Sequence, residues 1–218
     1  MKKVIIITLM ACLVLGAAFA DGLKVGAQGG YGLDTIKLTY SENTYAVTKK
    51  GGFYFAGTAE YDFSDSFAGK VEFGINTMGK AKGTGSIAGV SKTSEASESS
   101  PIKFSAYVGG EYALELSKEF NLLIGAGWDM MIGKESNDDD AKTNAAMGLG
   151  LEAVGAYSVN KNVAVTFGAK FGWHFINSDD QIKEDLSDVN SILDLFGAGD
   201  VKVGHTSFKF FAGITYAL

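Results

Sequence analysis

Residues 163–175 read VAVTFGAKFGWHF, and this stretch decides the fold. Every odd position, from Val163 to Phe175, is apolar, whereas the even positions are small or polar. Successive side chains of a β-strand point to opposite faces of its sheet, so a period of two predicts a strand with one apolar and one polar face. The two faces of such a strand meet two different environments.

The same alternation extends from Leu23 to the last residue, Leu218. It predicts eight strands, each long enough to cross a bilayer when tilted. The first strand is expected to slip its register between Leu33 and Ile36, as a β-bulge requires. The predicted strands cover residues 23–40, 51–63, 67–79, 102–116, 120–132, 145–158, 163–176 and 204–218.

The connections between these strands alternate between short and long. In an up-and-down meander every second connection lies at the same end, so the tight turns gather at one end and the long loops at the other. This asymmetry is typical of an outer-membrane barrel, with short periplasmic turns and long outward loops. The tight turns are residues 64–66, 117–119 and 160–162, and the long loops are residues 41–50, 80–101, 133–144 and 177–203.

Two of the long connections have a distinctive composition. Residues 80–100 are rich in Gly, Ser and Thr, which predicts a mobile loop. Residues 177–203 are acidic but carry apolar residues at helical spacing, which predicts a short helix from Ser187 or Asp188 to Gly197.

Alternation alone does not say which face of the barrel is outside, because a soluble lipocalin-like barrel is apolar inside. The aromatic residues gather near the strand ends, as in the two interfacial girdles of a membrane barrel, and glycine crowds the polar face, as a narrow lumen requires. These features favour an all-β, eight-stranded antiparallel up-and-down transmembrane β-barrel. The aromatic residues concerned are Tyr61, Phe63, Phe67, Tyr112, Phe120, Tyr157 and Tyr216 near the tight turns, and Trp128, Trp173 and Phe175 toward the long loops.

The first twenty residues are predicted to be a signal peptide, cleaved after Ala20, so that residues 21–218 form the barrel domain. Two lysines precede the uncharged apolar run at residues 4–16, and Ala18-Phe19-Ala20 forms an A-x-A cleavage site. A retained membrane anchor and a lipid attached to Cys12 are the alternatives. An exported barrel is expected in the outer membrane of a diderm bacterium.

The composition limits the classes of function. The 218 residues suit one domain, carry a net charge of −6 and include no arginine, which makes nucleic acid a poor partner. The single cysteine lies in the predicted signal peptide, so the mature chain has no disulfide to stabilise it.

Charged residues on the polar face are nearly balanced in sign. Height above the tight turns brings Glu72, Glu152, Lys170 and Lys209 together, and we predict a luminal ion-pair network among them. Unpaired charges would be costly in such an interior, so a balanced lumen favours a plug over a pore. The charges assigned to this face are Lys24, Lys37, Lys70, Lys103, Lys170 and Lys209, with Glu60, Asp62, Glu72, Glu111, Glu115, Asp129 and Glu152.

The chain resembles the small eight-stranded outer-membrane β-barrels, the group of the outer membrane protein A transmembrane domain and outer membrane protein X. Its end, Gly213-Ile214-Thr215-Tyr216-Ala217-Leu218, is similar to the C-terminal signal read by the barrel-assembly machinery. The resemblance therefore implies that machinery as a partner and Gly213, Tyr216 and Leu218 as the signal. The chain departs from the usual pattern at Leu218, where phenylalanine is common, and at Phe211, where a polar residue is common.

Catalytic and metal-binding candidates are few. His174, His205 and Ser207 lie toward the long-loop end of neighbouring strands, where a Ser–His contact would activate the hydroxyl. They fall on the luminal face, however, so hydrogen bonding is the preferred interpretation. Asp138 to Asp140 lack the spaced ligands of a calcium loop and are interpreted as a solvated run. We expect no cofactor and no metal.

The sequence thus predicts a non-enzymatic, monomeric outer-membrane barrel with a structural or surface-interaction role. Its expected partners are membrane lipid, a lipopolysaccharide-like glycolipid and an extracellular ligand bound by the long loops. A narrow channel is the main alternative. A lipid-modifying barrel enzyme and a soluble periplasmic carrier are the others.

Overall fold

The computed structural model describes residues 22–40, 43–77, 81–87, 90–95, 102–134, 143–177 and 202–218. The predicted signal peptide, the Asp138–Asp140 run and the predicted helix ending at Gly197 lie outside the described residues.

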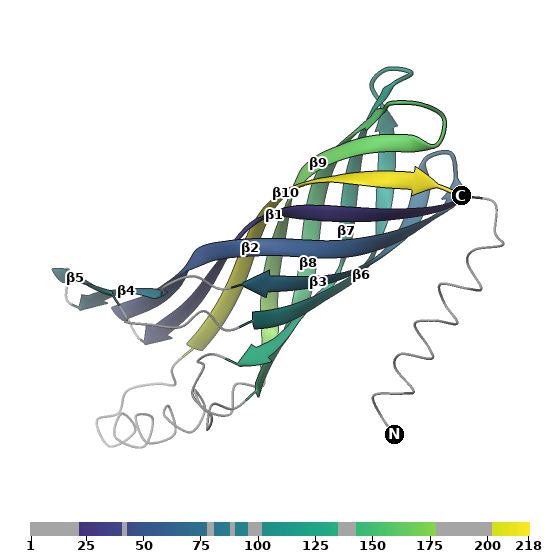
Figure 1. Ribbon diagram of the computed structural model, residues 1–218. Coiled ribbons are helices and arrows are strands. Elements are labelled where there is room, and N and C mark those ends of the chain that lie inside the picture. Colours follow the sequence, from purple (N-terminus) through teal and green to yellow (C-terminus); the bar gives the residue numbers. More distant parts are fainter. Residues whose placement is uncertain are drawn as a thin grey trace.

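The described residues form ten antiparallel strands and no helix that is long and apolar enough to cross a bilayer. Eight of these strands correspond to the predicted ones, and pairing of β1 with β2 closes them into a barrel (Figure 1). The eight-stranded barrel predicted from the alternation is therefore confirmed. The strands are β1 (Leu23–Tyr40), β2 (Asn43–Ser64), β3 (Phe67–Thr77), β4 (Ala81–Ile87), β5 (Val90–Glu95), β6 (Ile102–Glu115), β7 (Phe120–Lys134), β8 (Thr143–Ser158), β9 (Val163–Asn177) and β10 (Lys202–Ala217).

The short connections lie together at one end of the barrel, which we call the turn end. They join β2 to β3, β6 to β7 and β8 to β9, and both β1 and β10 also have their outermost residues there, where Leu23 pairs with Tyr61 and Lys24 with Ala217. In Figure 1 this is the end marked C. The opposite end is called the loop end.

Two segments that were predicted to be long loops contain β-strands instead. Residues 43–50 belong to β2 and pair with β1, so residues 41–42 alone separate these strands. Residues 81–95 include the hairpin of β4 and β5, and β4 pairs with β2. The predicted loops contain strand-forming Thr, Val and Tyr, and a neighbouring strand supplies partners for their backbone groups. We call the loop-end parts of β1 and β2, together with β4 and β5, the projecting sheet, which extends beyond the barrel in Figure 1.

The register shift predicted for the first strand lies in the neighbouring strand instead. β1 pairs with β10 in unbroken register from Lys24 to Thr39. The register shifts between β1 and β2, where Gly32 faces Gly52 but Asp34 faces Lys49, so the extra residue lies in β2. The alternation of β1 therefore continues through Asp34.

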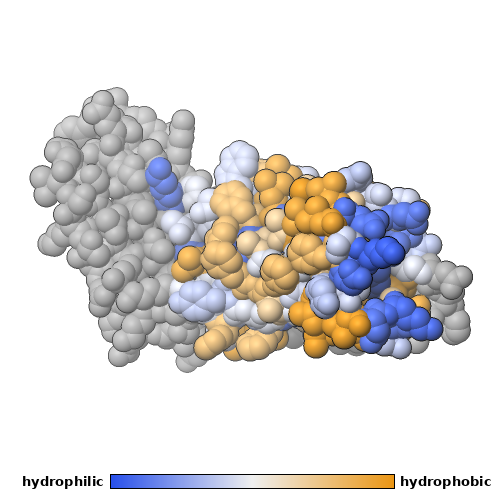
Figure 2. All heavy atoms as spheres, turned by 90° about the horizontal axis from the view of Figure 1, so that it is seen from above, coloured by the Kyte–Doolittle hydropathy of each residue, from blue (hydrophilic) through white to orange (hydrophobic). Residues whose placement is uncertain are grey.

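Polarity across the barrel wall is the reverse of that in a soluble protein. Large apolar side chains such as Phe53, Phe104 and Leu151 are more than half exposed on the outside, whereas charged side chains are buried inside. Figure 2 shows the apolar residues as a belt over the middle of the barrel, with hydrophilic residues gathered at the turn end. The apolar-outside assignment is confirmed, and the soluble lipocalin-like alternative is contradicted. The predicted turn-end aromatic residues lie on this surface, where Phe63 contacts both Tyr61 and Phe67.

Close packing of the strands requires glycine at particular positions. A Cβ on Gly30 would lie 1.8 Å from the backbone oxygen of Phe210, whereas a Cβ on Gly57 would approach nothing closer than 3.9 Å. We expect Gly30→Ala to lower the free energy of unfolding by about 3 kcal/mol, the upper end for overpacking, and Gly57→Ala to leave it nearly unchanged. Urea unfolding of the two refolded variants measures both values. Equal stability of the two variants would contradict this packing.

Candidate functional site

The interior of the barrel contains the densest set of charged side chains among the described residues. Strand alternation brings them inward, because every second residue of each strand faces the lumen. They are the carboxylates of Asp34, Glu60, Glu72, Glu111, Asp129 and Glu152, the ammonium groups of Lys70, Lys103, Lys170 and Lys209, and the imidazoles of His174 and His205.

A continuous ion-pair chain crosses the turn-end half of the lumen and its middle. The ammonium of Lys70 on β3 lies 2.8 Å from Glu111 on β6 and 3.1 Å from Glu152 on β8. Lys170 on β9 lies 3.4 Å from the same Glu152 oxygen and 2.6 Å from Glu72 on β3. We call these five residues the ion-pair chain. Alternation of sign along it gives each lysine two carboxylates.

Polar and aromatic groups complete the environment of this chain. Glu72 also accepts hydrogen bonds from Gln28 Nε2, at 2.7 Å, and from the hydroxyl of Tyr54. The ammonium of Lys170 lies 4.0 Å from the ring centroid of Tyr107. Both tyrosines are fully buried. Buried charges need such partners, and these groups also fill the space between the strands.

The loop-end half holds two separate histidine–aspartate pairs. His174 Nε2 lies 3.0 Å from Asp129 Oδ2, and His205 Nε2 is hydrogen-bonded to Asp34. Each aspartate also faces a lysine: Lys103 Nζ lies 3.3 Å from Asp34 Oδ2, and Lys209 Nζ lies 3.9 Å from Asp129 Oδ1. This half is therefore built from imidazole, carboxylate and ammonium groups in contact.

Three of the four residues predicted as an ion-pair network lie together. Lys170 contacts both Glu72 and Glu152, but the ammonium of Lys209 extends toward Asp129 instead. Lys209 and Lys170 are direct partners in the register of β9 and β10. Two neighbouring ammonium groups repel each other, so they turn to different carboxylates.

Two predicted luminal charges lie elsewhere, and one luminal carboxylate was missed. Lys37 and Glu115 are exposed, whereas Asp34 is 1% exposed and lies inside. The assumed slip in β1 exchanged the faces of Lys37 and Asp34. Glu115 is the last residue of β6 and still pairs with Asn121 of β7, so it lies in the wall at the turn end, where its side chain is exposed. An unbroken alternation from Lys24 would have identified Asp34.

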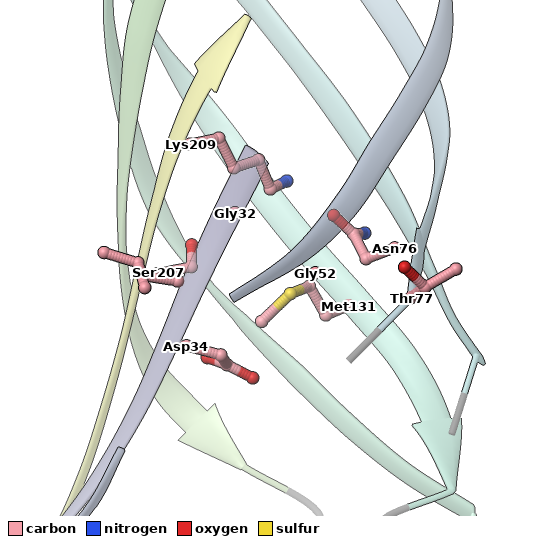
Figure 3. Close-up of a pocket in the computed structure, with 9 residues that line it drawn as sticks. Gly32, Asp34, Gly52, Asn76, Thr77, Met131, Ser207 and Lys209 are labelled. Carbon is pink, nitrogen blue, oxygen red and sulfur yellow. The ribbon is translucent and has the colours of Figure 1, made fainter. Parts of the chain in front are cut away.

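The described part of the barrel has cavities at both ends. A cavity of about 10 Å³ in the loop-end half has room for about one water. Figure 3 shows Lys209, Asp34 and Asn76 directed toward it from different strands. Cavities of about 70 and 120 Å³ lie at the turn end and share no lining residue with it.

Comparison with known proteins identifies the architecture. No protein-family model matches the sequence, and a search of curated proteins finds no match. Among solved structures, the Neisserial surface protein A has a TM-score of 0.56 at 14% identity, with 91% of this chain and 98% of that chain covered. This chain has the fold of a small outer-membrane β-barrel.

Two further outer-membrane barrels align with lower scores, which add no weight to the fold assignment. OprG from Pseudomonas aeruginosa has a TM-score of 0.49 at 10% identity, covering 91% of this chain and 98% of its own. The attachment invasion locus protein Ail of Yersinia pestis has a TM-score of 0.43 at 11% identity, covering 90% and 100%.

The candidate catalytic groups lie inside the outer-membrane barrel fold. Ser207 is 4% exposed and lines the small loop-end cavity. A Cβ on Gly172 would come within 2.4 Å of Ser207 Oγ and 2.6 Å of Asp129 Oδ2, so these groups are packed closely. Among the described residues, no group of three or more His, Cys, Asp or Glu side chains is arranged to hold a metal ion.

The residues of the C-terminal motif lie at the turn end of β10 in this barrel. Gly213 faces the lumen, where a Cβ would lie 2.5 Å from the backbone oxygen of Ala27. Tyr216 and Leu218 are on the outer surface, 47% and 57% exposed. The backbone N–H of Leu218 donates to Leu23 O at 2.9 Å, which joins the last residue to the first strand.

Proposed function

We propose that this protein is an integral outer-membrane barrel that carries the projecting sheet on the cell surface. The observation that carries the proposal is the reversed polarity of the wall, with charged side chains inside and an apolar belt outside. In hydrocarbon every backbone N–H and C=O needs an internal partner, and a closed barrel provides one for each. The belt and its aromatic rims suit lipid tails and interfaces.

The filled lumen supports a structural role over the alternative of a narrow channel. The ion-pair chain and the buried tyrosines occupy the middle of the barrel, where a conducting path would need water. We expect refolded protein to give no steady conductance in a planar bilayer. Regular single-channel steps would favour the channel.

The projecting sheet supports a surface-interaction role. β1 continues for six residues beyond Asp34, which corresponds to about 20 Å of strand. Lys37, which lies in this part of β1, is exposed and charged. A paired sheet presents an extracellular ligand with a more ordered surface than the mobile loop expected from the composition of residues 80–100.

The partners follow from this placement. We propose that the barrel is monomeric, contacts membrane lipid and a lipopolysaccharide-like glycolipid, and is inserted by the barrel-assembly machinery. We propose no nucleic-acid partner and no enzymatic activity. A lipid-modifying activity that is lost in Ser207→Ala, with the fold retained, would overturn the last point.

Surface display is tested by trypsin on intact cells. We expect cleavage in the hairpin at Lys82 or Lys92, because the loop end faces outward, while the turn-end Lys161 is cleaved only after the outer membrane is disrupted. A variant lacking residues 81–95 serves as the control. It should keep the folded barrel and lose the early cleavage. Cleavage first at Lys161 would reverse the orientation, and loss of the barrel in the deletion variant would contradict an independent display role.

A further inference from the structure

The chain has only two histidines, and they face each other in the loop-end half of the lumen. His174 on β9 and His205 on β10 are direct partners in the strand register, with ring centroids 4.7 Å apart and ring planes tilted by 32°. They are 1% and 3% exposed. We call them the histidine pair. Imidazole is the side chain whose charge ordinarily changes between about pH 5 and 8.

Each ring is held by a different carboxylate. Nε2 of His174 contacts Asp129, and Nε2 of His205 contacts Asp34, while the Nδ1 atoms of both rings are buried without a hydrogen-bond partner. One nitrogen of each ring is therefore held in place. The other nitrogen is where the charge state of the ring changes.

The described side chains that contact the histidine pair or its aspartates comprise two carboxylates and two ammonium groups. The carboxylates come from β1 and β7, and the ammonium groups come from β6 and β10. The nearby Lys170 of β9 forms its ion pairs within the ion-pair chain instead. β8 contributes Gly148 opposite His174 and no charge there. Two positive rings would therefore be in excess. The facing groups are Asp34, Asp129, Lys103 and Lys209.

The ring of His174 packs closely against the backbone of its own strand. A Cβ on Gly172 would already lie 2.9 Å from His174 Cε1. His205 is also the partner of Ile36 on β1, just before β1 and β10 leave the barrel toward the loop end. Repulsion at the histidine pair would therefore act on β9 and β10, and it reaches the projecting sheet through the pairing of β10 with β1.

We propose that the histidine pair is a proton-binding site that loosens the loop-end half of the barrel in acid. If both rings were charged, like charges would lie on adjacent rings whose centroids are 4.7 Å apart, in an interior that screens them poorly. The outcome is a barrel whose displayed sheet is held firmly when both rings are neutral and loosely when both are charged.

The test compares refolded full-length protein at pH 7.5 and pH 5.0, using the temperature at which the folded band is lost in SDS electrophoresis. The wild-type midpoint should fall in acid by at least about 5 °C, because a destabilisation of the folded state lowers the midpoint in proportion. His174→Gln and His205→Gln should each abolish most of this fall, since one imidazolium has no like-charged neighbour. Ser207→Ala, at the same level and without a titrating group, should keep it.

A second measurement does not depend on the variants folding. NMR of the histidine Cε1–H signals in detergent micelles should show two separate protonation steps, as coupled neighbours require. If both histidine signals instead shift together in a single protonation step, and the melting midpoint of the wild type does not fall in acid, the proposal is overturned. A fall in midpoint that persists in the His174→Gln, His205→Gln double variant would assign the response to carboxylates elsewhere and would also overturn it.

Discussion

Replacing Lys170 with methionine should lower the free energy of unfolding by about 3–5 kcal/mol, the range for removing one partner from a buried ion pair. The ammonium lies between Glu72 and Glu152 and is 1% exposed. Methionine fills a similar volume, but it leaves two carboxylates in the lumen without this cation. Urea unfolding of the variant in lipid vesicles measures the loss, and planar-bilayer recording shows whether water enters the lumen.

The control for this variant is Lys161→Met, at an exposed position of the tight turn between β8 and β9. It removes the same charge from the chain and should change stability by less than about 0.5 kcal/mol. Adding Glu72→Gln to Lys170→Met should recover part of the loss, because one of the stranded carboxylates becomes neutral. If Lys170→Met is as stable as Lys161→Met and does not conduct, the ion-pair chain does not hold the lumen together.

Replacing Phe171 with arginine should cost about 2–4 kcal/mol in a bilayer, the range for a cation on the lipid face near the midplane. Phe171 adjoins Lys170 in β9 and is 41% exposed on the outer surface. In water an exposed arginine is well tolerated, so the large cost arises only if lipid covers this surface. The measurement is urea unfolding in lipid vesicles.

Val159→Arg is the matched control for depth. Val159 is 57% exposed at the turn end, outside the apolar belt, so the same cation there should cost less than about 1 kcal/mol. The test compares the loss of unfolding free energy caused by arginine at the two positions. Equal costs at Phe171 and Val159 would mean that the belt is not immersed in hydrocarbon.

Much of the fold follows from the sequence, because a strict period of two and the positions of the tight turns are local properties. The stretch Val163–Phe175 specifies its own two faces without reference to any neighbour. The projecting sheet could not be predicted in this way. Residues 43–50 pair with β1 on one side and with residues 81–87 on the other, and the second pairing joins segments far apart in the chain.

The sequence predicts which charged residues face the lumen, but it does not predict which of them form ion pairs with one another. Alternation assigns Glu72, Glu152 and Lys170 to the interior, yet the choice of which carboxylate each lysine contacts depends on geometry across the lumen. For example, Lys209 was expected to join Glu72 and Glu152, but repulsion from Lys170 directs its ammonium toward Asp129. Asp34 was missed for a different reason: a bulge assigned to the wrong strand reverses the predicted face of every residue beyond it.

The most direct test of a closed barrel with an apolar exterior is the electrophoretic mobility in SDS of the chain refolded in detergent, cold against boiled. A closed barrel resists SDS until it is heated, so we expect two distinct mobilities, with the cold sample retaining the folded form. A single mobility, from protein that stays soluble without detergent, would contradict the account, because the apolar face would then be inside.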